Sequence, residues 1–401
     1  MNATDAPASR GTTRNRGLFV LVVLSLSGFV TSFGAHIVAT NLPTYAQSVG
    51  VGAFMIGVLI AVYDFAELFA KPVAGFVADK RGMKTILLAG LVVFIAGSLL
   101  FLVIRPSLLV LVRFTQGLGA AALSTVSISL VARYFSENRG RSLGIYNAIK
   151  GAGYVIAPAA GGFLASRFGF SMLFLVSAAI GAFVLVLSLF LPGDTSSAFE
   201  DDDDASLKDF VAIFADRALR PMYAVIVINM FMVGALFGFL PVYLHGLGYS
   251  SVRSGTVLSV STAAYLLIQP VAGMLADRFD IRTTVMIGLA LSATAIMVMT
   301  FTSGWPLIGV VIAAGFGIGT VWTNSDTMVA ASASRGKLGA SIGAAQSFKE
   351  FGDMVGPLVI GAITQLFSVR IGFVTCGLIG LSCLLVLSLG RTTQVRDAGQ
   401  R

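Results

Sequence analysis

Charged side chains are scarce in this sequence of 401 residues. They make up 11% of it, whereas 56% of the residues are hydrophobic, and a water-soluble protein carries roughly 25% charged residues. So few charges do not cover the surface of a soluble body. The composition therefore indicates that lipid is the solvent for much of the chain.

Cysteine is nearly absent as well. Its two copies, Cys376 and Cys383, lie seven residues apart in the last apolar run, so we expect buried thiols rather than a disulfide or a metal site. The phosphate loop of ATP-driven pumps is also missing, because Leu338 follows Gly336-Lys337 where serine or threonine is required. We predict no cofactor, no metal site and no enzymatic activity.

Long apolar runs are what the sequence does contain. A membrane-spanning helix needs about 20 apolar residues, and these runs are too long, and alternate too little, for the strands of a barrel. They predict an all-α membrane protein with twelve transmembrane helices between a tail at 1–16 and a tail at 391–401. The twelve runs are 17–40, 52–77, 84–104, 107–132, 140–163, 170–191, 221–244, 251–275, 283–303, 306–331, 338–362 and 370–390.

An internal repeat groups these helices. The segment Pro72–Asp79 returns as Pro270–Asp277 at an offset of 198, with six of eight positions identical, and Leu42-Pro43-Thr-Tyr45 returns as Leu240-Pro241-Val-Tyr243. A repeat of this length indicates a duplicated unit. It predicts two six-helix bundles, 17–192 and 221–390, related by a pseudo-two-fold axis along the membrane normal.

The segment 193–220 joins the predicted bundles. Its acidic run at 200–204 reads as a flexible linker, with a metal or partner site as the alternative, and the apolar residues between 207 and 214 predict an amphipathic helix at the membrane surface.

Lysine and arginine set the orientation. With the N-terminus inside, 19 of the 27 basic residues lie on the inner side and four on the outer side. We therefore expect a multi-pass protein of the cytoplasmic membrane with both termini inside. The net charge of +8 follows from this topology, so no nucleic-acid partner is expected.

Ionisable side chains inside the predicted spans mark candidate function, because each costs about 2.5–3.5 kcal/mol at a helix centre. Asp64, Glu67 and Lys71 share one helix face. Asp64 lies about 22 Å along the helix from Asp79, near the midplane, where a carboxylate can load and release a proton. Neutralising ion pairs, such as Lys349 with Asp353, are the structural alternative.

We take Asp64 and Glu67 as the leading proton site. The candidates for proton coupling are Asp64, Glu67, Arg113, Asp326, Glu350 and Asp353. The candidates for binding a small-molecule substrate are His36, Asn41, Gln116, Tyr146, Lys150, Asn229, Asn324 and Lys349.

Three further motifs stand out in the sequence: Gly75–Lys84, Arg113–Ala121, and Gly144–Gly162, which returns as Gly343–Gly361. In this order they resemble the loop between helices 2 and 3, the helix-4 motif, and the helix-5 motif of proton-driven exporters in one family, the major facilitator superfamily. Met83 replaces a usual basic residue of the loop, and Ala157 replaces a usual glycine before Pro158.

The resemblance implies a monomeric exporter of a drug or metabolite that exchanges its cargo for protons by alternating access. A proton-coupled importer, a facilitator, and an exporter of charged, metal-chelating or lipid-linked cargo remain alternatives. The implied gating residues are Gly75, Asp79, Lys80, Arg81, Gly82, Lys84, Arg133, Asp277 and Arg278. The implied helix-packing residues are Gly144, Gly153, Pro158, Gly161, Gly162, Gly352, Gly356 and Pro357.

Overall fold

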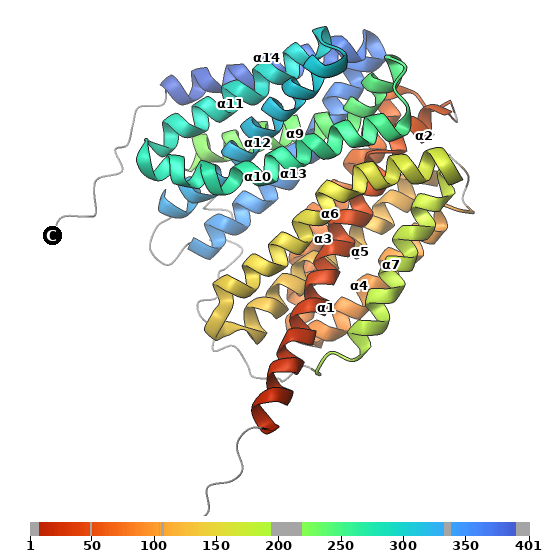
Figure 1. Cartoon of the computed structure of the whole chain (residues 1–401), viewed down its shortest axis with the longest axis vertical. Helices are drawn as coiled ribbons and strands as arrows, with labels where there is room; N and C mark the ends of the chain where they lie inside the picture. The colour runs from red at the N-terminus through yellow and green to blue at the C-terminus, as the bar shows by residue number, and fades with distance from the viewer. Residues whose placement is uncertain are drawn as a thin grey trace, which may run out of the picture. The chain divides into compact units, whose positions relative to one another are not determined.

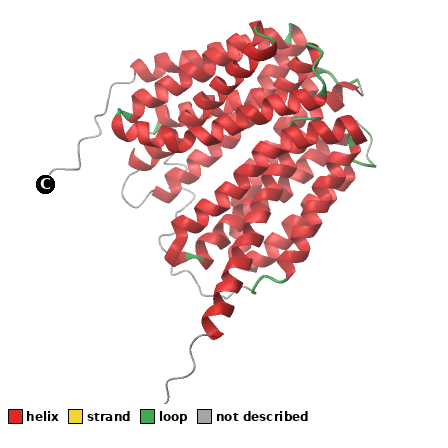
Figure 2. Ribbon diagram, viewed as in Figure 1, coloured by secondary structure: helices red, strands yellow, loops and turns green. Residues whose placement is uncertain are grey.

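A computed structural model describes residues 8–48, 50–103, 105, 108–193, 219–332 and 338–389, and every regular element in these ranges is a helix (Figure 2). The predicted linker helix at 207–214, the acidic run at 200–204 and the tail at 391–401 lie outside the described residues.

Twelve of the helices in the described ranges have at least 18 residues, and each contains one of the predicted apolar runs or most of it (Figure 1). Ten of these are long and apolar enough to cross a membrane, and α14 adds an apolar stretch over Val369–Leu384. The twelve are α1 (Ala8–Ala39), α3 (Ala53–Arg81), α4 (Met83–Leu100), α5 (Leu109–Tyr134), α6 (Arg139–Phe168), α7 (Ser171–Leu189), α9 (Arg220–Gly246), α10 (Ser251–Arg278), α11 (Ile281–Val298), α12 (Gly304–Ser332), α13 (Leu338–Leu366) and α14 (Val369–Leu389).

The helices form two compact units. The first holds α1 up to Val38, α3 from Ala66 onward, and α4 to α7. The second holds residues Ala39–Phe65, which include α2 (Leu42–Ser48) and the first half of α3, together with α9 to α14. Thus α3 contributes to both units. The bundle boundaries predicted from the repeat stay a prediction.

The repeat is visible in how each unit packs. In the first unit, α4 packs against α5 and α7; in the second, α11 packs against α12 and α14, their counterparts in the repeat. Single glycines match as well: a methyl group at Gly90 would lie 3.2 Å from the carbonyl oxygen of Gly119, and one at Gly288 would lie 3.1 Å from that of Gly317. Small residues at these crossings let the helix backbones approach closely.

The helices differ from the apolar runs in two places. Helix α1 begins at Ala8, inside the predicted tail. Leu42 opens the separate seven-residue helix α2, whereas Leu240, its counterpart in the repeat, lies inside α9. Apolar runs report which residues sit in lipid, and a helix continues into water as long as its backbone bonds are made, so run ends and helix ends need not coincide.

The turn between α3 and α4 depends on a glycine. Gly82 has a φ of +94°, which a residue with a side chain rarely adopts. Both cysteines are free and buried, as expected.

Candidate functional site

Helix α3 carries the first group of ionisable side chains. Lys71 and Glu67 form an ion pair, with 2.6 Å between Nζ and Oε2, as the spacing of four residues allows. Glu67 and Asp64 are both about nine-tenths buried, at 9% and 8% exposure. Asp64 and Asp79 both lie in α3, which contains Pro72 between them, and the depth of Asp64 in the membrane stays a prediction.

A buried polar chain joins α5 to α4 in the first unit. The Arg113 guanidinium donates to Oε1 of Gln116 at 2.8 Å, and the Gln116 amide donates to Oγ of Ser98 at 3.3 Å. Arg113 is 1% exposed, and among the described residues it is the largest side chain that is fully buried. Two of the predicted site residues therefore hold one another in place within the unit.

His36 lies where α1 packs on α6, one turn from a hydrogen bond that joins Ser32 to the backbone of Lys150. Nδ1 of His36 donates to the carbonyl oxygen of Ser32 at 2.9 Å, and its ring lies edge-on against Tyr154, 4.4 Å between centroids. Ser32 in turn donates to the carbonyl oxygen of Lys150 at 2.6 Å. With its proton on Nδ1, a neutral His36 presents Nε2 as an acceptor.

Tyr146 also lies in the first unit. It is fully buried, and its hydroxyl is 2.8 Å from Oγ of Ser127 on α5.

The second unit contains a more elaborate group. Lys349 of α13 pairs with Asp326 of α12, 2.6 Å from Nζ to Oδ2. The same ammonium lies 4.5 Å above the ring of Trp322, and Trp322 packs edge-on against Tyr265 of α10, 5.5 Å between centroids. Three helices therefore build one cluster of an acid, a base and two aromatic rings.

Exposure differs sharply across this ion pair. The Lys349 side chain is 6% exposed, whereas the Asp326 side chain is 40% exposed. Two-fifths of the carboxylate side chain is therefore at the surface of the unit, whereas the ammonium is buried and depends on it for a counter-charge.

The sequence leaves the partner of Lys349 open, and the structure pairs it with Asp326, 23 residues away. Asp353, at i+4, lies against α9: a methyl group at Gly234 would be 2.7 Å from its Oδ1. Glu350 is half-buried on the same helix.

The three predicted asparagines are all buried in the second unit. Asn324 donates to the carbonyl oxygens of Ala272 and Thr320, and Asn41 donates to Oγ1 of Thr40. Asn229 donates weakly to the carbonyl oxygen of Ile318 at 3.4 Å. Within the described residues, its own Oδ1 accepts no hydrogen bond. Asn229 therefore has a buried acceptor whose hydrogen-bonding capacity is unused within the described residues.

The predicted gating residues lie at helix ends. Asp79 and Arg81 are exposed, and Lys80 lies 4.2 Å above the ring of Phe76. Lys84 donates to the carbonyl oxygens of Leu189 and Leu191 at 2.9 and 2.6 Å, which ties the start of α4 to the end of α7. Gly75 packs on α5, and Arg133, Asp277 and Arg278 lie in the last turns of α5 and α10.

The predicted helix-packing residues differ in how closely they approach a neighbouring helix. A methyl group at Gly153 would lie 2.9 Å from the backbone nitrogen of Phe33, and one at Gly352 would lie 2.8 Å from Cβ of Met230, so these two set how closely α6 approaches α1 and α13 approaches α9. Gly144 has open space around it within 4 Å. The others are Pro158 inside α6, buried Gly161 and Gly162, Gly356 against Phe231, and Pro357 inside α13.

Trp322 and Tyr265 were missed as site residues. The sequence does hold a signal for Trp322, because it precedes Asp326 by four residues and so shares its helix face. Tyr265 stands where the repeat offset of 198 places Glu67, so the two halves differ chemically at this position.

No group of three or more histidine, cysteine or acidic side chains that would hold a metal ion occurs in the part of the chain that the structure describes.

Known proteins resemble this chain in sequence. The sequence pattern of the Major Facilitator Superfamily matches residues 24–263 and 246–400. The chain is 24% identical to Multidrug resistance protein MdtG of Citrobacter koseri over 90% of its own length and 92% of that protein. It is 25% identical to Multidrug resistance protein Stp of Mycobacterium tuberculosis over 86% of its length and 75% of that protein.

Solved structures resemble the fold. The nucleoside transporter NupG superposes with a TM-score of 0.79 at 14% identity, over 92% of this chain and 98% of that one. A bacterial homolog of the human lysosomal transporter Spinster, inward-facing and unoccupied, gives a TM-score of 0.77 at 15% identity, over 93% and 97%. At these identities the likeness concerns the fold alone.

Proposed function

The chain belongs to the major facilitator superfamily, and we propose that it exports small organic compounds in exchange for protons. It is a membrane transporter rather than an enzyme. The observation that carries the proposal is the Asp326–Lys349 pair, in which a partly exposed acid neutralises a buried base inside a membrane-spanning region. Multidrug resistance proteins among the relatives support export of organic compounds.

Such a pair gives a proton a structural effect. Protonation of Asp326 removes the charge that holds Lys349, and a buried ammonium without a counter-charge is costly. The cluster then relaxes by moving Lys349, a helix, or both. A group whose packing changes with one proton can couple a proton gradient to a conformational equilibrium, and 1–3 kcal/mol of coupling shifts populations five- to a hundredfold or more.

The Glu67–Lys71 pair and nearby Asp64 form the second proposed proton site. Here a similar acid–base pair lies on one helix, with both acids about nine-tenths buried. We keep Asp64 and Glu67 as coupling residues, with the Asn229 carbonyl and the Trp322 ring as substrate contacts. The proposal includes alternating access, a monomer, a cytoplasmic membrane location, both termini inside, and gating by the charged residues at the ends of α3 and α10.

The test uses purified protein in vesicles with an imposed pH step and ethidium as the transported probe. We expect Asp326→Asn and Glu67→Gln each to reduce pH-driven ethidium flux at least tenfold while ethidium binding stays measurable. Glu137→Gln, which changes an exposed carboxylate in η2 (Ser136–Asn138), should transport normally.

Two outcomes would count against this function. Full pH-driven flux in Asp326→Asn, Asp64→Asn and Glu67→Gln would show that the proton passes elsewhere. Wild-type flux that ignores the pH step, over a panel of organic compounds, would favour a facilitator.

A further inference from the structure

A groove lies along the start of α9. Its volume is ≈ 500 Å³, and its lining residues are Arg220, Tyr223, Ala224, Val227, Ile228 and Phe348. Five of the six come from the first nine residues of α9, and Phe348 comes from α13. The transport argument above uses none of them.

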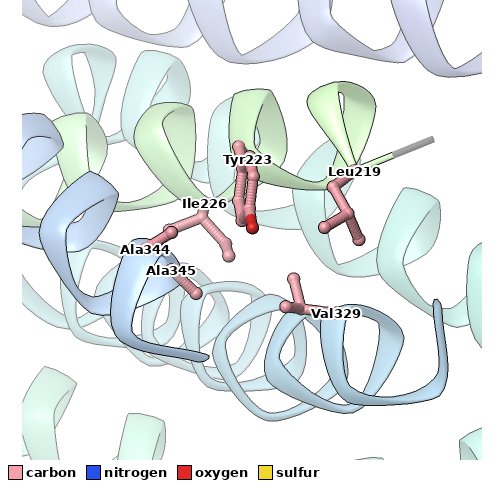
Figure 3. Packing of buried hydrophobic residues seen from close by; sticks show 6 residues of the cluster. All are labelled: Leu219, Tyr223, Ile226, Val329, Ala344 and Ala345. Carbon is pink, nitrogen blue, oxygen red and sulfur yellow. The ribbon is translucent and has the colours of Figure 1, made fainter. Parts of the chain in front are cut away.

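The floor of the groove is aromatic and closed. The rings of Tyr223 and Phe348 are stacked, 4.5 Å between centroids. Behind them Tyr223 packs in a tight core with Leu219, Ile226, Val329, Ala344 and Ala345 (Figure 3). The Tyr223 hydroxyl donates to the carbonyl oxygen of Ser341, so the groove meets the ring rather than the hydroxyl. A ligand would therefore lie along the surface of the unit and not enter its core.

The groove has one charged end. Arg220, the first residue of α9, is exposed. The other lining side chains are apolar or aromatic, and the one polar atom among them, the Tyr223 hydroxyl, already donates to Ser341. From Arg220 to Ile228 the helix rises about 12 Å. The hydrocarbon layer of one leaflet, which is half of the bilayer core, is about 15 Å thick. The groove therefore has a cation at one end and an apolar surface along its length. These two features complement the anionic head group and the acyl chain of a lipid.

We propose that this groove binds an anionic phospholipid, with its phosphate on Arg220 and one acyl chain along Ala224, Val227 and Ile228 over the Tyr223–Phe348 stack. The chemistry is that of basic pockets between membrane helices, which hold anionic head groups. A guanidinium suits this role because it donates to two phosphate oxygens at once. The lysine and arginine distribution predicts that this end of α9 faces the inner leaflet.

Fluorescence quenching at the groove tests the proposal directly. The variant Phe348→Trp puts an indole in the floor, and the unchanged chain, which holds Trp305 and Trp322, supplies the background. The protein is reconstituted in phosphatidylcholine vesicles with increasing fractions of brominated phosphatidylglycerol or brominated phosphatidylcholine. We expect half-maximal quenching of the new indole at a roughly fivefold lower fraction of phosphatidylglycerol, the factor one interfacial arginine supplies.

Three further changes in the Phe348→Trp background separate the two ends of the ligand. Arg220→Gln should remove the preference for phosphatidylglycerol, whereas Arg253→Gln, another exposed arginine near a helix start, should keep it. Ala224→Phe fills the channel and should weaken quenching by both lipids; Val227→Phe serves if the first variant does not fold. Inorganic phosphate at 10 mM should not compete, since it has no chain to bury.

The proposal is overturned if both brominated lipids quench alike, or if Arg220→Gln keeps the preference. It is also overturned if quenching appears only after residues 207–214 are deleted, because the groove would then belong to that segment. Finally, if Arg220→Gln changes ethidium binding and leaves lipid quenching intact, the groove takes transported compounds instead.

Discussion

At the scale of single residues, the Asp326–Lys349 pair should respond asymmetrically to mutation. Asp326→Asn leaves a buried ammonium without a counter-charge, so we expect it to cost about 1–3 kcal/mol of stability. Lys349→Met leaves an acid that is 40% exposed, so its cost should be under about 1 kcal/mol. Adding Lys349→Met to Asp326→Asn should restore stability.

Thermal unfolding in detergent of the unchanged protein, the two single variants and the double variant measures these stabilities as a double-mutant cycle. Glu137→Gln is the control for loss of an exposed carboxylate. Equal losses in the two single variants, or no recovery in the double variant, would contradict the dependence of Lys349 on Asp326.

Ion pairs show how far single residues can be read from a sequence. Glu67 and Lys71 pair within one helix, so their spacing is sufficient evidence. Lys349 and Asp326 come from different helices, and which face of α13 meets α12 depends on packing that the spacing of charges does not encode. The ionisable residues were therefore identified from the sequence, but the partner of Lys349 was not.

At the scale of helices, glycines at crossings should resist substitution while lipid-facing ones should not. A methyl group at Gly317 of α12 would lie 2.6 Å from the carbonyl oxygen of Gly288 and 2.7 Å from Cβ of Ser292. We expect Gly317→Ala to cost about 1–3 kcal/mol, because α11 and α12 must separate. Thermal unfolding measures the loss.

Gly309 is the matched control on the same helix. It is exposed, and a methyl group there would meet nothing within 4 Å. Gly309→Ala should therefore be neutral or gain up to about 1 kcal/mol from the better helix propensity of alanine. A similar loss in both variants would mean that backbone flexibility, and not the helix crossing, explains the glycines.

Helices were predicted more completely than their ends. The apolar runs located every long helix in the described residues because burial in lipid leaves a continuous signal. The start of α1 at Ala8 was not predicted, because polar residues in a helix leave no apolar signal. The helix α2 was not predicted because seven residues are too few for an apolar run.

At the scale of the whole molecule, the charge distribution predicts the orientation in the membrane. In intact cells, a membrane-impermeant maleimide should label Arg253→Cys, at an exposed position in the first turn of α10 on the predicted outer side, and should leave Glu137→Cys, between α5 and α6, unlabelled. Cys376 and Cys383 are buried and should give little background. Labelling in the reverse pattern would place both termini outside.

The division of α3 between the two units bears on transport. Its first half packs with α9 and α13: a methyl group at Gly238 would lie 2.7 Å from Cδ1 of Ile60, and one at Gly361 would lie 3.3 Å from Cα of Gly57. Such glycine contacts allow close approach without interlocking side chains, which suits a surface that separates and re-forms. If α3 moves against α9 during each cycle, the contact at Ile60 is made and broken once per turnover.

Joining these helices covalently should therefore stop transport. We expect the pair Ile60→Cys and Gly238→Cys, bridged by a short bifunctional thiosulfonate, to lose nearly all pH-driven ethidium flux and to recover it after reduction. The controls are Ile60→Cys alone and Gly238→Cys alone, which the reagent modifies without joining α3 to α9. Both should keep their pH-driven flux after treatment. If the bridged pair also keeps its flux, α3 and α9 move as one body, and the motion that carries the cargo takes place elsewhere.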